Sequence, residues 1–206
     1  VGWNETHVLR LARKVFFAYG AQRDDPYFKG NEIRLLVSPD HNHRAGAAER
    51  VNAMIDLTNL EHYREGNRLE AKLALGGFPH SVWETYSAFA NTAGGIILLG
   101  VEERQDHSLH AVDLPAPEKL IEEFWETVND PQRVSANLLR AEDVQLHIVE
   151  WNRIVVITVP EAPPACKPVY LGRDPLLGTY RRSGEGDYRC TPAEVQATLR
   201  AARSAR

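Results

Sequence analysis

Apolar and polar positions follow the clearest pattern in the part of the chain after residue 60. Residues 69–75 alternate between the two kinds, which predicts a strand. Ser81 and Glu84 have the spacing of a capping box, which predicts the start of a helix that Gly94 ends. Residues 95–101 are almost wholly apolar and predict a central strand of a sheet.

The second half of the chain shows both helical and strand-like spacing. Residues 118–129 carry apolar side chains at helical intervals and predict an amphipathic helix. Residues 144–151 and 153–159 predict a pair of strands with Asn152 in their tight connection. After a proline-rich loop, the sequence predicts a short strand over 179–182 and a final helix running towards Arg203, started by Thr191, Pro192 and Glu194.

The first sixty residues have a weaker pattern. We expect a helix over residues 5–19, a short strand over 32–38 and a second helix over 45–55. We interpret residues 1–60 as an N-terminal helical extension packed on a domain formed by residues 61–206. Because strands and helices are mixed without regular alternation, the predicted fold class is α+β, with a mixed sheet packed by helices.

The composition is that of a globular protein. Of 206 residues, 43% are hydrophobic and 25% charged, and no apolar run approaches the roughly 20 residues that span a bilayer. Cys166 and Cys190 lack metal-ligand spacing and are expected to be reduced thiols. We therefore expect a cytoplasmic protein that does not associate with membranes.

The net charge of −4 argues against a uniformly basic nucleic-acid binder. The charge is unevenly distributed, however. Residues 161–206 contain eight Lys and Arg against five Asp and Glu, a net of +3, which leaves −7 for residues 1–160. A locally basic face on an acidic protein is compatible with this distribution.

Recognisable motifs lie in four segments: 65–72, 87–103, 155–170 with its proline loop, and 179–184 followed by 191–194. Together they resemble the Schlafen AlbA_2 domain, a family also labelled divergent AAA-4. The resemblance covers roughly residues 60–203, and its most specific part is the Ala-Phe-Ala-Asn-Thr-x-Gly-Gly block over 88–95. The family usually has Glu-Ser and Glu-Phe-Lys where this chain has Glu65-Gly66 and Glu70-Ala71-Lys72.

Carboxylates provide the candidate chemistry. Glu70 lies on a predicted strand and Glu103 just beyond another, so that with Glu65 they could converge on a hard cation such as Mg²⁺ or Mn²⁺. The resemblance implies that acids matching Glu65, Glu70 and the Glu102–Glu103 pair are the catalytic, metal-binding set of Schlafen ribonucleases, with Glu103 the better match of the pair. The alternative is surface acids that form salt bridges. No other cofactor is expected.

The candidate nucleic-acid-binding residues are Lys72, Arg181, Arg182 and Arg189. Because alternate strand residues point to opposite faces, only one of Arg181 and Arg182 can face a given ligand. Tyr180 and Tyr188 could stack on unpaired bases. The alternative for the basic residues is solvated charge, and it is the resemblance that raises the expectation of nucleic-acid contact.

The sequence leaves three candidate functions. The first is a nucleic-acid-binding domain, for DNA or RNA, in a transcriptional regulator or effector. The second is a metal-dependent endoribonuclease with a three-carboxylate site. The third is a dimerisation or protein-interaction domain, since a single lobe could form a homodimer. An ATPase is excluded because no G-x₄-G-K-[ST] loop is present to hold phosphates.

Overall fold

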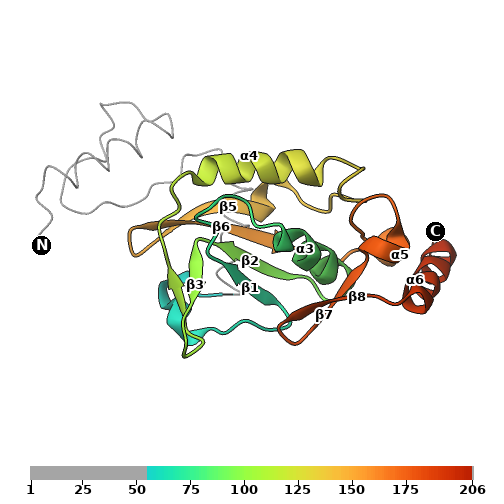
Figure 1. Cartoon of the computed structure of the whole chain (residues 1–206), viewed down its shortest axis with the longest axis horizontal. Helices are drawn as coiled ribbons and strands as arrows, with labels where there is room; N and C mark the ends of the chain where they lie inside the picture. Colours follow the sequence, from blue (N-terminus) through green and yellow to red (C-terminus); the bar gives the residue numbers. More distant parts are fainter. Residues whose placement is uncertain (1–54, 206) are drawn as a thin grey trace, which may run out of the picture. The chain divides into compact units, whose positions relative to one another are not determined.

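A computed structural model describes residues 55–205 of the chain (Figure 1). The elements predicted over 5–19, 32–38 and 45–55 precede this part or end at its first residue, so they stay predictions. The helical segments are η1 (Leu57–His62), α3 (Ser81–Asn91), α4 (Pro117–Val128), η2 (Ala141–Asp143), η3 (Pro164–Cys166), α5 (Pro175–Gly178) and α6 (Pro192–Ser204). The strands are β1 (Leu69–Lys72), β2 (Gly95–Leu99), β3 (Val101–Glu103), β4 (Leu109–Ala111), β5 (Val144–Val149), β6 (Asn152–Val159), β7 (Tyr180–Ser183) and β8 (Gly186–Arg189).

A four-stranded sheet with the order β1-β2-β6-β5 forms the centre of the described part. β1 runs parallel to β2, while β2 with β6 and β6 with β5 are antiparallel. The sheet is therefore mixed, and together with the helices it confirms the predicted α+β class. Every residue of β2 is buried, as expected for a central strand.

Each face of this sheet is covered by a separate hydrophobic cluster. One cluster joins α3 and α4 to the sheet, and in it the rings of Trp83 and Phe124 stack with centroids 5.1 Å apart. The other joins the sheet to η1 and the β3–β4 hairpin and includes Ile55, Leu57 and Leu60. Figure 1 shows α4 running above the sheet and β3 to the left of β1. Within residues 55–205, no helix has the length and hydrophobicity needed to traverse a bilayer.

The strand predicted over 95–101 is interrupted at Gly100. This glycine has a φ of +84°, and a Cβ atom there would lie 2.7 Å from Cγ of Leu114, so the position favours glycine on both counts. The chain changes direction at Gly100 and pairs next with β4 in a separate two-stranded sheet. Glu103 therefore lies on a different sheet from Glu70.

Of the helix caps predicted from the sequence, the one at α6 forms and the one at α3 does not. The capping box of α6 forms: the Glu194 amide donates to Thr191 Oγ1 at 3.3 Å, and the Thr191 amide donates to Glu194 Oε2 at 2.7 Å. The capping box predicted for Ser81 and Glu84 is wrong, because α3 has His80 at its N-cap without a side-chain cap. Glu84 instead accepts a hydrogen bond from the Tyr180 hydroxyl at 3.0 Å.

Two strand ends also differ from prediction. β1 ends at Lys72 rather than near residue 75, and Ala74 has a φ of +53°, which is incompatible with a strand. The predicted pairing of the later strands is confirmed, but Asn152 is not in their connection: it pairs with Val149 at the start of β6. The turn consists of Glu150 and Trp151, with φ of +48° and +73°, the signs required by a type I′ turn.

Replacing Glu150-Trp151 by Asn-Gly should stabilise the protein. Positive φ suits Asn and Gly better than Glu and Trp, and Trp151 is 75% exposed, so its removal costs little burial. We expect a rise of about 2–4 °C in the thermal unfolding midpoint measured by circular dichroism. Trp151→Ala keeps the positive φ on a residue with a Cβ, and an equal rise in that control would contradict the explanation.

Candidate nucleic-acid interface

The β7–β8 hairpin separates two neighbouring arginines. Arg181 pairs with Tyr188, and Arg182 pairs with Asp187, so the two pairs point to opposite faces. The side chain of Arg182 is 0% exposed and faces inward, whereas that of Arg181 is 46% exposed. The expected division of the two arginines between the faces is confirmed.

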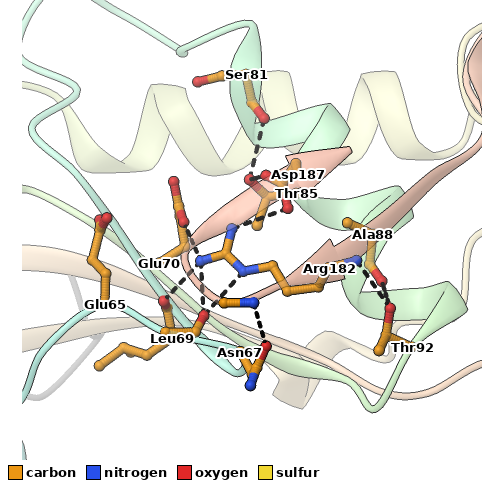
Figure 2. A network of polar contacts seen from close by, with 12 residues as sticks. Glu65, Asn67, Leu69, Glu70, Ser81, Thr85, Ala88, Thr92, Arg182 and Asp187 are labelled. Atoms are coloured by element: carbon orange, nitrogen blue, oxygen red, sulfur yellow. Dashed lines mark hydrogen bonds and ion pairs between the residues drawn. The ribbon is translucent and has the colours of Figure 1, made fainter. Parts of the chain in front are cut away.

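Arg182 is held by partners from two segments of the chain, residues 66–70 and β8 (Figure 2). Its Nη2 donates to Glu70 Oε2 at 2.6 Å, and its Nη1 donates to Asp187 Oδ1 at 3.0 Å. Nε and Nη2 also donate to the Gly66 carbonyl at 3.0 and 2.8 Å, and Nη2 lies 3.2 Å from the Leu69 carbonyl oxygen. Burial disfavours the charged form of Arg182, but the bonds to Asp187 and Glu70 outweigh it and raise the pKa of the guanidinium.

The helix α3 and its C-cap residue Thr92 bind the same hairpin through polar side chains. Thr85 Oγ1 donates to Asp187 Oδ2 at 2.6 Å, and Thr92 Oγ1 accepts from the Arg182 amide at 3.1 Å. Asn91 Nδ2 donates to the carbonyls of Val169 and Tyr180 at 2.7 and 3.0 Å. The Asn-Thr pair of the 88–95 block therefore fixes the hairpin to the helix.

The three candidate carboxylates lie near one another but have different partners. Glu65 Oε1 accepts from the Ala71 amide at 2.8 Å. Glu70 is bound on Oε2 by Arg182, and its Oε1 is ion-paired with Lys72. Glu103 Oε1 lies 2.8 Å from Nδ1 of His107. Burial raises the pKa of Glu65, and the negative charges of Glu70 and Glu103 raise it further.

This arrangement does not fit a three-carboxylate metal site. A divalent ion needs free carboxylate oxygens directed at one point, and both oxygens of Glu70 already face cationic groups. Among residues 55–205, no group of three or more His, Cys, Asp and Glu side chains is placed to hold a metal ion. The proposed metal and catalytic roles of Glu65, Glu70 and Glu103 stay predictions.

A protein-family model described as "Schlafen, AlbA_2" matches residues 65–191, which is more than half of the chain. The chain belongs to the Schlafen AlbA_2 family. The match confirms the sequence-based resemblance and begins at Glu65, the first of the three acids. No functionally curated protein matches the chain.

Two solved structures resemble this Schlafen AlbA_2 chain at low TM-scores. The N-terminal domain of a RecG-related protein from Nitrosomonas europaea is 27% identical, with 72% of this chain and 93% of that chain covered, at a TM-score of 0.44. The DIP2311 protein from Corynebacterium diphtheriae is 17% identical, with 76% of this chain but 32% of that chain covered, at 0.45. This chain thus spans about a third of the second protein, and neither superposition is close enough to add to the family assignment.

The two departures from the Schlafen AlbA_2 pattern leave the contacts of the site in place, and the surroundings of Gly66 do not require glycine, because a Cβ atom there would have no neighbour within 4 Å. At Gly66, where the family usually has Ser, the backbone carbonyl accepts two hydrogen bonds from Arg182. Ala71, where the family usually has an aromatic residue, is buried in the cluster with Ile96 and Leu98. Glu70 and Lys72, on either side of Ala71, keep their ion pair, so the substitution changes packing rather than the charges of the site.

The structure places the four predicted basic residues in different settings. Lys72 and Arg182 are bound to Glu70, and Arg182 is inaccessible from solvent. Arg189 is exposed, with its guanidinium 5.8 Å from the centroid of the Tyr180 ring. Arg181 lies on the outer face, 5.8 Å from the centroid of the Tyr188 ring, with its Nε 3.3 Å from Glu194 Oε1. Arg181 is thus the member of the 181–182 pair available to a ligand.

Sequence reasoning missed Asp187 and Thr85. Asp187 lies on β8, which was not predicted, and Thr85 bonds to it from α3. The signal for β8 was present: Gly184 and Gly186 flank Glu185 and precede alternating side chains, which is a hairpin signal. A hairpin predicted from this signal would have placed Asp187 opposite Arg182 on the neighbouring strand.

Substitution of the buried Arg182 should lower the free energy of unfolding much more than substitution of the exposed Arg181. Arg182→Met leaves Glu70 and Asp187 without their shared cation, and we expect a loss of about 3–5 kcal/mol in the free energy of unfolding measured in urea. Arg181→Met, the matched control on the same strand, removes an exposed pair with Glu194 and should cost less than about 1 kcal/mol. Similar losses in both variants would refute the assigned roles.

Glu65→Gln should stabilise the protein at neutral pH. The amide oxygen still accepts from Ala71, while the charge that burial and the neighbouring acids disfavour is gone. Because the pKa of Glu65 is raised in the folded state, its destabilising effect develops as the pH rises through and above its ordinary value of 4.5. We expect a thermal midpoint about 1–2 °C higher than wild type at pH 7, with the difference disappearing below pH 4.5.

Proposed function

We propose that this Schlafen AlbA_2 domain binds nucleic acid through the outer face of its β7–β8 hairpin and that it contacts unpaired bases. The observation that carries the proposal is the pairing of Tyr188 with Arg181. Tyr188 is 53% exposed, and the Arg181 guanidinium lies over its ring. An exposed aromatic ring stacks on a base without regard to sequence, and an adjacent arginine can contact the phosphate.

The inner face of the hairpin supports this use of the outer face. Arg182 and Asp187 attach the hairpin to β1 and α3, and the Gly184 amide near its tip donates to Asn67 Oδ1 at 2.7 Å. The backbone that carries Arg181 and Tyr188 is therefore fixed before any ligand binds. A fixed backbone lowers the entropy lost on binding.

Glu194 opposes the proposed interaction. Its hydrogen bonds with Thr191 and the nearby Arg181 lower the pKa of this carboxyl, so it is ionised at neutral pH. It then competes with phosphate for the Arg181 guanidinium. With a net charge of −4 on the whole chain, we expect modest affinity that falls as salt is added.

The proposal can be tested by fluorescence anisotropy with labelled single-stranded RNA, single-stranded DNA and duplex DNA. Tyr188→Ala should weaken single-strand binding by about 5- to 100-fold, the range of one lost base stack. Arg181→Gln should reduce the slope of log affinity against log salt by about 0.7. Glu194→Gln keeps the capping geometry of α6 and should strengthen binding.

Trp151→Ala provides the matched control, because Trp151 is an exposed aromatic residue on a different hairpin. It should leave binding unchanged. Equal weakening by Trp151→Ala and Tyr188→Ala, or no binding by the wild-type chain, would refute the proposed interface. Cleavage of the labelled RNA, or a dimer with no nucleic-acid affinity in light scattering, would favour the endoribonuclease or the dimerisation domain instead.

A further inference from the structure

Glu70 faces a permanent cation on each of its two oxygens. Oε2 accepts from Nη2 of Arg182 at 2.6 Å, and Oε1 is ion-paired with Nζ of Lys72. The Glu70 side chain is only 6% exposed, so solvent ions have little access to it. The central acid of the predicted metal set is therefore already neutralised by the protein.

A divalent ion on either oxygen would stand close to these cations. Mg²⁺ binds carboxylate oxygens at about 2.1 Å, so an ion on Oε2 would lie within about 5 Å of the Arg182 Nη2 atom. At that separation like charges repel strongly in a partly desolvated site. An ion on Oε1 would meet the ammonium of Lys72 in the same way.

Moving the Arg182 side chain away from Glu70 would break several further contacts. Its guanidinium also donates to Asp187 and to the carbonyls of Gly66 and Leu69, and it lies 5.1 Å from the centroid of the Phe89 ring. Displacing it would leave buried acceptors unpaired. Losing its proton is no alternative, because arginine stays charged in proteins and these bonds raise the pKa further.

We propose that Arg182, with Lys72, is the built-in counter-cation of the carboxylate cluster and takes the place of a divalent metal at Glu70. The domain then holds Glu70 and Asp187 together without Mg²⁺ or Mn²⁺. This inference stands apart from the proposed nucleic-acid interface, which lies on the opposite face of the hairpin.

The first test measures Mn²⁺ binding by electron paramagnetic resonance on the wild-type chain, Glu65→Gln and Glu103→Gln. Both substitutions replace carboxylates that are more accessible than Glu70, so the variants should fold. We expect Mn²⁺ binding to be the same in all three, and the wild-type thermal midpoint to be equal in Mn²⁺ and in EDTA. A Mn²⁺ site that either substitution weakens by about tenfold or more would overturn the proposal.

The second test removes the guanidinium. Arg182→Met leaves Glu70 and Asp187 facing each other without it, and we expect Mn²⁺ to raise the thermal midpoint of this variant by several degrees. Arg182→Lys keeps a positive charge and should not respond. A folded Arg182→Met variant without a Mn²⁺ response would overturn the proposal, and if that variant does not fold, the first test decides alone.

Discussion

A single buried guanidinium joins the parts of this Schlafen AlbA_2 domain that carry its candidate chemistry. Arg182 lies on β7, yet its partners are Glu70 on β1, Asp187 on β8 and the Gly66 carbonyl. A buried ion of this kind is tolerated only when each of its charges and donors has a partner. The positions of β1, the hairpin and α3 are therefore mutually dependent.

The polar face of α3 extends the same constraint. Thr85, Asn91 and Thr92 bind the hairpin through side-chain oxygens and nitrogens, while the apolar residues of the helix pack on the sheet. The Asn-Thr pair in the most specific block of the sequence thus has a structural reason to be present. What remains for a ligand is the other face of the hairpin, where Arg181 and Tyr188 are exposed.

Much of the fold after residue 60 was predictable because hydrophobic periodicity is a local signal. The central strand, the amphipathic helix α4, the β5–β6 pair and the capping box of α6 were all found from spacing. The break at Gly100 was not, because it depends on the position of Leu114 in three dimensions. The strand β4 was not predicted because three residues give too little periodicity to recognise, whereas β8 has a hairpin signal in the sequence that the prediction did not use.

The site was harder to predict than the fold. The alternation rule correctly separated Arg181 from Arg182, but spacing cannot show which face is buried. That depends on Asp187 and Glu70, which lie 5 and 112 residues away along the chain. The convergence of the three carboxylates on a shared ion stays a prediction, whereas the pairing of Glu70 with Lys72 and Arg182 could be found only from coordinates.

The distance between Glu70 and Arg182 along the chain also bears on biosynthesis. The ribosome delivers β1, α3 and β2 long before the residue that neutralises Glu70. Until then Glu70 has Lys72 but not Arg182 as a partner, and its Oε2 atom stays open to water. A nascent chain halted before β7 would therefore lack the guanidinium that links β1 to the hairpin, and the polar side of α3 would stay in water.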